Sequence, residues 1–133
     1  MVQQASPSAP PVSGGPVEPS CLEDLVLASH ILAEQGVLDG YGHCSIRHPH
    51  AKERFFLSAS LSPAVIATGD IMEYDLDCNP VDQRGRKMFL ERFIHGEIYK
   101  ARPDVVAVVH SHSPAVVPFR SEEHTSELQS RET

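Results

Sequence analysis

The sequence has few cysteines, few basic residues and no long apolar run, and each shortage excludes a class of protein. Its 133 residues include three cysteines, Cys21, Cys44 and Cys78, which form no CxxC pair. An odd, scattered set of this kind predicts free thiols rather than a disulfide framework. Lys and Arg number 11 against 18 Asp and Glu, so the net charge is −7. That balance argues against nucleic-acid and anionic-membrane partners, which attract clustered cations.

Membrane insertion and export are also disfavoured. No apolar stretch approaches the roughly 20 residues that cross a bilayer. The opening residues, "MVQQASPSAPPVSGGPVEPS", contain no Lys or Arg and no continuous apolar core, unlike a secretory signal. We therefore expect a cytoplasmic protein. Residues 1–19 are rich in Pro, Ser, Gly and Ala, a composition that buries little apolar surface, and they are predicted to form a disordered leader.

The folded part is expected to begin with a helix in "SCLEDLVLASHILAEQG". Ser20 and Glu23 have the spacing of a capping box, in which each side chain accepts a backbone N–H at the start of a helix. Gly36 stands where a helix C-terminal glycine is expected. Residues at helical spacing define one buried face of this helix: Leu22, Leu25, Val26, Ser29, Leu32 and Ala33.

Strands and a second helix follow. Short strands are predicted at 44–47, 54–59 and 70–77. A helix is predicted at 86–101, and Pro103 ends it because proline cannot continue a helix. Its apolar stripe consists of Leu90, Ile94, Ile98 and Ala101. Residues 105–109 are apolar at consecutive positions, as expected for a strand covered on both faces. This order of elements predicts a layered α/β fold.

The last residues differ abruptly from the rest. The segment "RSEEHTSELQS" is polar and without periodicity, and it resembles a translated sequencing-adapter read-through. We therefore expect residues 120–133 to be a non-native tail, with the native sequence cut short near Phe119. A genuine disordered tail is the alternative. The folded domain is accordingly predicted over residues 20–119, incomplete at its C-terminus.

The strand at 105–109 leads into two histidines, His110 and His112, in "VVAVVHSHSP". Side chains alternate across a strand, so residues two apart point to the same side. Imidazole nitrogens bind zinc at about 2.0–2.1 Å, and two imidazoles suit Zn, Fe, Ni or Cu better than Mg or Ca. The pattern makes His110 and His112 candidate metal ligands. Polar residues hydrogen-bonded at a strand end are the alternative.

A carboxylate on the preceding helix is the second part of this hypothesis. Glu91 lies in the first turns of the predicted helix, and the short Arg102-Pro103 connection folds that helix back against the strand. Glu91 can therefore reach the same pocket as an oxygen ligand or as a general acid/base, with a solvated surface charge as the alternative. His95, one turn further on, can orient Glu91 through a hydrogen bond or be an ordinary surface residue.

Together, "GYGHCSIRHP" and "LERFIHGEIYKARPDVVAVVHSHSPAVVPF" resemble the class II aldolase/adducin family, over about residues 22–119. The resemblance implies a three-layer α/β/α sandwich, usually assembled as a tetramer with sites at subunit interfaces. It also implies that His110 and His112 are two of three histidines that hold a divalent metal, usually zinc, with Mn, Fe or Co as alternatives. Glu91 becomes the acid/base. The third histidine of the family lies beyond Phe119, so an inactive fragment is expected.

Within that family the sequence looks most like the branch acting on hydroxylated aromatic or pyridine carboxylates, such as the 3-hydroxy-2-methylpyridine-4,5-dicarboxylate decarboxylases. Sugar-phosphate aldolases of the family carry two serines where this chain has Phe89 and Leu90, and they tend to have asparagine at the position of His43. The expected activity is a metal-dependent carbon–carbon lyase that decarboxylates its substrate through an enolate-like anion. A sugar-phosphate aldolase or epimerase and a non-catalytic adducin-like module are the alternatives.

Four further residues are candidate substrate contacts. His43 and Ser45, just after the turn at Gly42, are placed to bind the departing carboxylate or the ring substituents, with turn capping as the alternative. Arg47 and Ser58 are candidates of the same kind. The expected partners are a small-molecule substrate and further copies of the chain.

Overall fold

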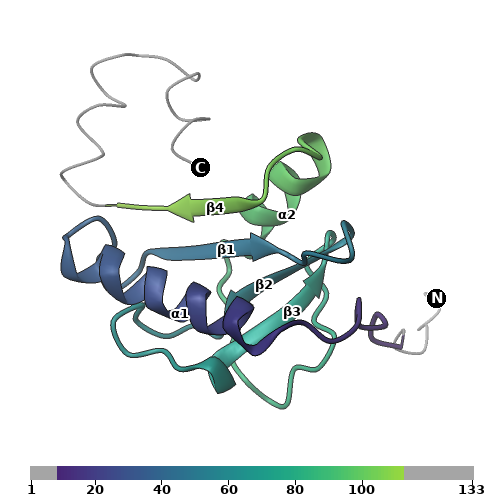
Figure 1. Ribbon diagram of the computed structural model, residues 1–133, viewed down its shortest axis with the longest axis horizontal. Helices are drawn as coiled ribbons and strands as arrows, with labels where there is room; N and C mark the ends of the chain where they lie inside the picture. The colour runs from purple at the N-terminus through teal and green to yellow at the C-terminus, as the bar shows by residue number, and fades with distance from the viewer. Residues whose placement is uncertain (1–8, 113–133) are drawn as a thin grey trace, which may run out of the picture.

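The computed structural model describes residues 9–112, and Figure 1 shows how its helices and strands are arranged. The first helix, α1, spans Pro19–Glu34. The elements that follow are β1 (His43–Arg47), β2 (Arg54–Ser58), the short 3-10 helix η1 (Thr68–Asp70), β3 (Ile71–Asp75), α2 (Arg92–Ala101) and β4 (Ala107–His110). Every predicted helix and strand is present, with ends that differ by several residues. None of the described helices is long and apolar enough to span a membrane.

The four strands form one antiparallel sheet in the order β3-β2-β1-β4. In the register of β1 and β4, His43 pairs with His110, and Ser45 pairs with Val108. Residues that lie directly opposite each other on neighbouring strands share a face of the sheet. The register therefore places the side chains of His43 and His110 next to each other.

Each face of the sheet carries one helix, so the fold has three layers (Figure 1). On one face, Leu25 of α1 packs in a buried cluster with Cys44 of β1 and Phe56 of β2. On the other face, Tyr99 of α2 packs against a larger cluster. Its other buried members are Phe55, Leu57, Ala59, Met72, Tyr74, Cys78, Phe89 and Val108. The predicted α/β/α sandwich is confirmed.

The start of α1 differs from the prediction. The helix begins at Pro19, with Glu18 as its N-cap residue and no side-chain cap, so Ser20 lies inside the first turn and the predicted capping box is wrong. Proline suits this position, because its fixed φ is helical and its missing N–H has no partner to lose there. The predicted end is confirmed, since Gly36 follows the helix with a φ of +77°.

Residues 9–18, predicted as part of a disordered leader, make defined contacts with the sheet. The carboxylate of Glu73 in β3 accepts hydrogen bonds from Ser13 Oγ and from the Gly14 N–H, both at 2.7 Å. These bonds satisfy polar groups of a segment that has little apolar surface to bury. Composition alone does not reveal these contacts, and the extent of the predicted disordered leader stays a prediction. The first eight residues and the tail at 120–133 lie outside the described residues.

The second helix, α2, begins at Arg92 rather than at residue 86, and it buries a face other than the predicted one. The Lys87 carbonyl accepts a hydrogen bond from the Ser60 N–H, which draws the chain before α2 into a non-helical path and leaves Glu91 just outside the helix. The buried residues of α2 are His95, Gly96 and Tyr99. Leu90, from the predicted apolar stripe, is 84% exposed. The face that carries polar groups therefore meets the sheet.

Strand β4 is fully covered on one face only, so the prediction that it is covered on both faces is wrong in part. Val108 is fully buried against the α2 layer, whereas on the other face Ala107 is exposed and Val109 is partly buried against the α1 cluster. The aliphatic run thus combines one buried side with one open side. Consecutive apolar residues alone do not distinguish this arrangement from a central strand.

Gly96 sets how closely α2 approaches the turn after β3. A Cβ at this position would lie 2.6 Å from the carbonyl oxygen of Leu76 and 2.5 Å from Cys78 Sγ. We predict that Gly96→Ala destabilises the protein by about 1–3 kcal/mol through overpacking, although alanine is the better helix former. Urea denaturation measures the change. Gly69→Ala, which adds a methyl group where nothing lies within 4 Å, is the control. Equal stabilities of the two variants would contradict the prediction, because they would show that Leu76 and Cys78 move aside at little cost.

Candidate active site

Strand β1 presents alternate side chains to α2. His43, Ser45 and Arg47 contact residues of α2, whereas Cys44 and Ile46 belong to the cluster on the α1 side. This alternation is the period of two that an extended strand imposes on its side chains. Three polar side chains are thereby carried into the layer between the sheet and α2.

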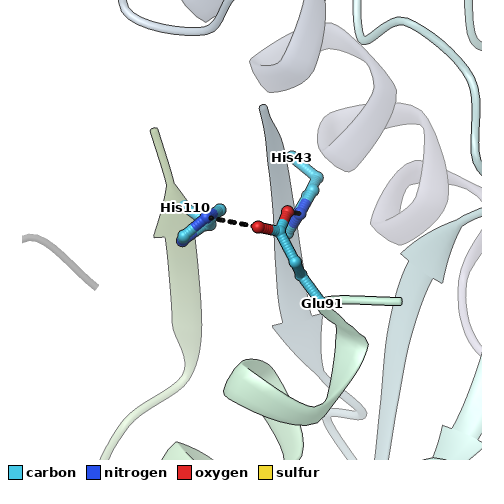
Figure 2. Close-up of side chains that lie close together, drawn as sticks. All are labelled: His43, Glu91 and His110. Atoms are coloured by element: carbon cyan, nitrogen blue, oxygen red, sulfur yellow. Dashed lines mark hydrogen bonds and ion pairs between the residues drawn. The ribbon is translucent and has the colours of Figure 1, made fainter. Parts of the chain in front are cut away.

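Glu91 lies at the entrance to α2, between histidines from two neighbouring strands (Figure 2). Its Oε1 is 3.3 Å from Nε2 of His43, and its Oε2 is 3.4 Å from Nε2 of His110. The Glu91 side chain is 43% exposed, while that of His43 is 2% exposed and that of His110 is 15% exposed. The structure thus brings together three of the predicted site residues, with a buried imidazole on one side of an accessible carboxylate.

The ring nitrogens of His110 and His112 converge. Their Nε2 atoms lie 3.1 Å apart, and Glu91 Oε2 is 3.7 Å from Nε2 of His112. Two nitrogens that bind one zinc ion tetrahedrally at about 2.0–2.1 Å lie about 3.3 Å from each other. The two imidazoles, with the Glu91 carboxylate beside them, therefore have the donor types and the spacing that suit a divalent metal.

A second set of donors overlaps the first. Ligand atoms of His43, Glu91 and His110 all lie within 4.8 Å of one another. The two sets share Glu91 and His110, and they differ in whether His43 or His112 completes the site. Which of these two histidines is available as a ligand depends on the hydrogen bonds that each already makes.

Behind His43, a chain of hydrogen bonds runs into the core. His43 Nδ1 lies 2.7 Å from Nε2 of His95, and Nδ1 of His95 lies 2.6 Å from Ser45 Oγ. Ser45 Oγ is in turn 2.8 Å from the hydroxyl of Tyr99. His95 and Ser45 are both fully buried. The structure therefore does not bring Ser45, a predicted substrate contact, to a surface that a substrate reaches.

Burial changes the ionisation of these groups. Burial lowers the pKa of His43 to about 4, although the hydrogen bond to Glu91 acts in the opposite direction. Burial, with help from the neighbouring imidazoles, holds the pKa of His95 well below its usual value. For Glu91, burial acts to raise the pKa, but the hydrogen bond from His43 and the nearby imidazoles lower it overall. At neutral pH Glu91 is therefore a carboxylate that faces the neutral imidazole of His43.

Arg47 and Ser58, the other predicted substrate contacts, bind backbone carbonyls. Ser58 Oγ donates to the carbonyl of Ala59. The Arg47 guanidinium donates to the carbonyls of Lys52, Tyr99, Arg102 and Val105. These bonds tie the end of α2 to the segment that leads into β4. The structure places neither side chain beside Glu91.

Tyr99 is the member of this arrangement that the sequence did not single out. The sequence feature that could have identified Tyr99 is its spacing. Glu91, His95 and Tyr99 are four residues apart, so they lie on one side of a helix. An aromatic residue in an amphipathic helix is ordinarily a core residue, and Tyr99 is also that. The hydroxyl becomes informative only once its partner on β1 is known.

Comparisons with known proteins were made for sequence and for structure. The family model described as Class II Aldolase and Adducin N-terminal domain matches residues 23–130. Decarboxylase tropJ of Talaromyces stipitatus is 45% identical over 92 residues, which are 68% of this chain and 35% of that protein. The 3,4-dihydroxyphthalate decarboxylase of Arthrobacter keyseri is 36% identical over 105 residues, with 71% of this chain and 41% of that protein covered. The chain thus spans less than half the length of these relatives. The matched range includes residues 120–130, and the origin of that tail stays a prediction.

Solved structures show the same likeness. The L-fuculose 1-phosphate aldolase from Glaciozyma antarctica superposes with a TM-score of 0.67 at 30% identity, covering 76% of this chain and 43% of that one. An aldolase II superfamily protein from Pseudomonas syringae gives a TM-score of 0.67 at 29% identity, covering 77% and 43%. The sheet and its two covering helices are therefore an arrangement already seen in this group of structures.

The buried imidazole of His95 makes folding sensitive to acid. Because its pKa is lowered in the folded state, the unfolded chain takes up the proton more readily, so stability present at neutral pH is lost as the pH falls below about 6.5. We predict that His95→Gln, which removes the titrating group, makes the free energy of unfolding less dependent on pH between about 7 and 5. Urea denaturation at a series of pH values measures this dependence. An equally steep decline in the variant would contradict the prediction.

Proposed function

The chain belongs to the class II aldolase and adducin N-terminal domain family, and on this premise we propose that the protein is a divalent-metal-dependent carbon–carbon lyase that decarboxylates a hydroxylated aromatic or pyridine carboxylate. The observation that carries the proposal is the Glu91 carboxylate beside the converging imidazoles of His110 and His112. Two relatives named as decarboxylases support it.

In this proposal His110 and His112 hold the metal. Two imidazoles favour zinc, with Mn, Fe and Co as further candidates. When bound, such a cation supplies Lewis-acid stabilisation of the negative charge that develops on a substrate oxygen. The family resemblance implies a third histidine ligand beyond Phe119, outside the described residues.

Glu91 carries the proton in the proposed reaction. It is ionised at neutral pH, because its pKa lies below the usual value, and its Oε2 lies on the side of the exposed His112. There it accepts the proton of a substrate hydroxyl. It then delivers this proton, as a general acid, to the carbon that carries the carboxylate, so that the hydroxyl becomes a carbonyl. When the carbon–carbon bond breaks and carbon dioxide leaves, the electron pair of that bond is delocalised onto the carbonyl oxygen as an enolate-like anion.

The alternatives have less support at this site. The structural likeness to L-fuculose 1-phosphate aldolase favours a sugar-phosphate substrate, but a phosphate needs hydrogen-bond donors. The two side chains directly before Glu91 are those of Phe89 and Leu90, which have none. The Phe89 ring instead packs 4.4 Å from that of His43. A non-catalytic adducin-like module has no need of paired imidazoles next to a carboxylate.

Three further features belong to the proposal: a small-molecule substrate, a homotetramer with sites at subunit interfaces, and a cytoplasmic location. The family resemblance is the reason for the first two, and the composition of the chain is the reason for the third. Size-exclusion chromatography with light scattering measures the oligomeric state directly.

Metal content tests the ligand assignment. We predict that the chain binds about one zinc ion and that His110→Ala or His112→Ala reduces this content, because each substitution removes a ligand. Elemental analysis after dialysis measures the ratio of zinc to protein. His50→Ala removes an exposed histidine away from the site and is the matched control. Equal zinc contents in all variants would remove His110 and His112 from the proposed site.

Turnover tests the role of Glu91. In a full-length version that supplies the third histidine, we expect Glu91→Gln to keep bound zinc but to lose about 10²- to 10⁴-fold in the rate of carbon dioxide release, since the amide cannot carry the proton. Hydroxylated aromatic carboxylates such as 3,4-dihydroxyphthalate are the substrates to assay, with L-fuculose 1-phosphate as the competing class. Cleavage of the sugar phosphate without any decarboxylation would favour the aldolase alternative. An unchanged rate in Glu91→Gln would contradict the assignment of Glu91.

A further inference from the structure

The hydrogen-bonded chain behind Glu91 alternates between the α2 side and β1. Glu91, His95 and Tyr99 are four residues apart, and His43 and Ser45 are two residues apart. From Glu91 to Tyr99, the four successive contacts measure 3.3, 2.7, 2.6 and 2.8 Å. The chain thus joins an accessible carboxylate to a phenol that is 1% exposed.

The two ends of this chain set the direction of its hydrogen bonds. A carboxylate has only acceptors, so the bond between Glu91 and His43 requires a proton on Nε2 of His43. At the other end, burial raises the pKa of Tyr99, which keeps its hydroxyl protonated. Within residues 9–112, the hydrogen-bond partner of that hydroxyl is Ser45. Tyr99 therefore donates, and Ser45 accepts.

With both ends fixed, each bond between them runs the same way. Ser45 accepts from Tyr99 and donates to Nδ1 of His95. His95 then carries its proton on Nε2 and donates to Nδ1 of His43. His43 in turn carries its proton on Nε2 and donates to Glu91. All five groups are satisfied while both imidazoles are neutral.

The opposite direction leaves two groups unsatisfied. If His43 bound a metal through Nε2, its proton would sit on Nδ1, and His95 and Ser45 would donate toward Tyr99. The Tyr99 O–H would then be buried without an acceptor among the described residues, and in the chain without metal the unprotonated Nε2 of His43 would face the Glu91 carboxylate with no proton between them. Leaving a buried donor unpaired is costly, so the first direction is favoured.

We propose that His95, Ser45 and Tyr99 fix His43 as the Nε2–H tautomer, which makes His43 a positioning donor to Glu91 rather than a metal ligand. The importance of Glu91 rests on the proposed function, whereas the tautomer follows from the contacts alone. The proposal assigns the metal to His110 and His112. It also gives Ser45 a role at a distance from the substrate.

The tautomer can be measured in the chain without an assay of activity. Long-range nitrogen–proton NMR correlations distinguish a protonated ring nitrogen from a bare one. We expect His43 and His95 to show a protonated Nε2 and a bare Nδ1 at neutral pH, both without and with added zinc. A bare Nε2 on His43 in either sample would overturn the proposal.

Zinc binding separates this proposal from the proposed function. His43→Gln places an amide N–H where the Nε2–H stood, so its zinc content is expected to match that of the unchanged chain, while His110→Ala lowers it. Loss of zinc in both variants would make His43 a ligand and overturn the proposal. If neither variant loses zinc, the metal site at His110 is wrong, and the NMR result still decides the tautomer.

A matched pair of variants at position 95 tests the positioning role. His95→Gln keeps a donor near the place of Nε2, whereas His95→Asn keeps a polar group only near Nδ1. In the full-length version that supplies the third histidine, we expect His95→Asn to lower kcat by about 10- to 100-fold with little change in KM, and His95→Gln to retain most of the activity. Equal losses in the two variants would indicate a merely structural role and overturn the positioning role.

A second pair removes one hydroxyl from each of two buried tyrosines. Tyr99→Phe takes away the first donor of the hydrogen-bonded chain and is expected to lower kcat of the full-length version. Tyr74 is equally buried, in the same core cluster, but its hydroxyl donates to Met72 Sδ, so Tyr74→Phe is expected to leave kcat unchanged. Equal kcat values for the two variants would count against the contribution of Tyr99.

Discussion

The site depends on a match between two structural repeats. Four residues of an α-helix advance about 6 Å, and two residues of a strand advance about 6.8 Å. Because these steps are nearly equal, Glu91, His95 and Tyr99 interleave with His43 and Ser45 through contacts of 2.6–3.3 Å. The helix repeat thus places His95 and Tyr99, and Glu91 continues the same row from the N-cap position of α2.

This polar contact between α2 and β1 also specifies how the helix sits on the sheet. The apolar cluster around Phe55 and Leu57 is stabilised by burial, which is non-directional and tolerates small shifts. Hydrogen bonds do not tolerate such shifts, because a buried polar group left unpaired costs about 1–3 kcal/mol. Sliding α2 by one turn would leave several buried polar groups unpaired at once. Gly96 permits the close approach of α2 to Leu76 and Cys78 in the turn after β3. The residues that arrange the chemistry thus also select one packing of the helix.

Local patterns predicted the parts of the site that depend on local geometry. An aliphatic strand that ends in HxH indicates converging imidazoles, because alternation along a strand needs no knowledge of the rest of the fold. The pairing of His43 with His110 depends on which strands are neighbours, and no short segment encodes it. The buried face of α2 was predicted from its aliphatic residues, yet burial follows His95 and Tyr99, whose partners on β1 lie 52 and 54 residues away in the sequence. Sequence patterns predict that a polar residue in a helix is exposed, unless its distant hydrogen-bond partner is known.

The histidines of the site differ in solvent exposure, and this difference suits an exposed imidazole and a buried imidazole to different roles. His112 is 41% exposed and His43 is 2% exposed. In the proposed function a catalytic cation keeps a coordination position open to substrate, and a charge is costly to bury, so His112 at the rim suits a ligand better than the buried His43 does. A neutral imidazole loses less on burial, and with the pKa of His43 lowered to about 4 it keeps one protonation state throughout the physiological range. In the proposed function His43 can therefore act as a constant donor, and Glu91, at the boundary between the two environments, is the group that exchanges a proton with the substrate.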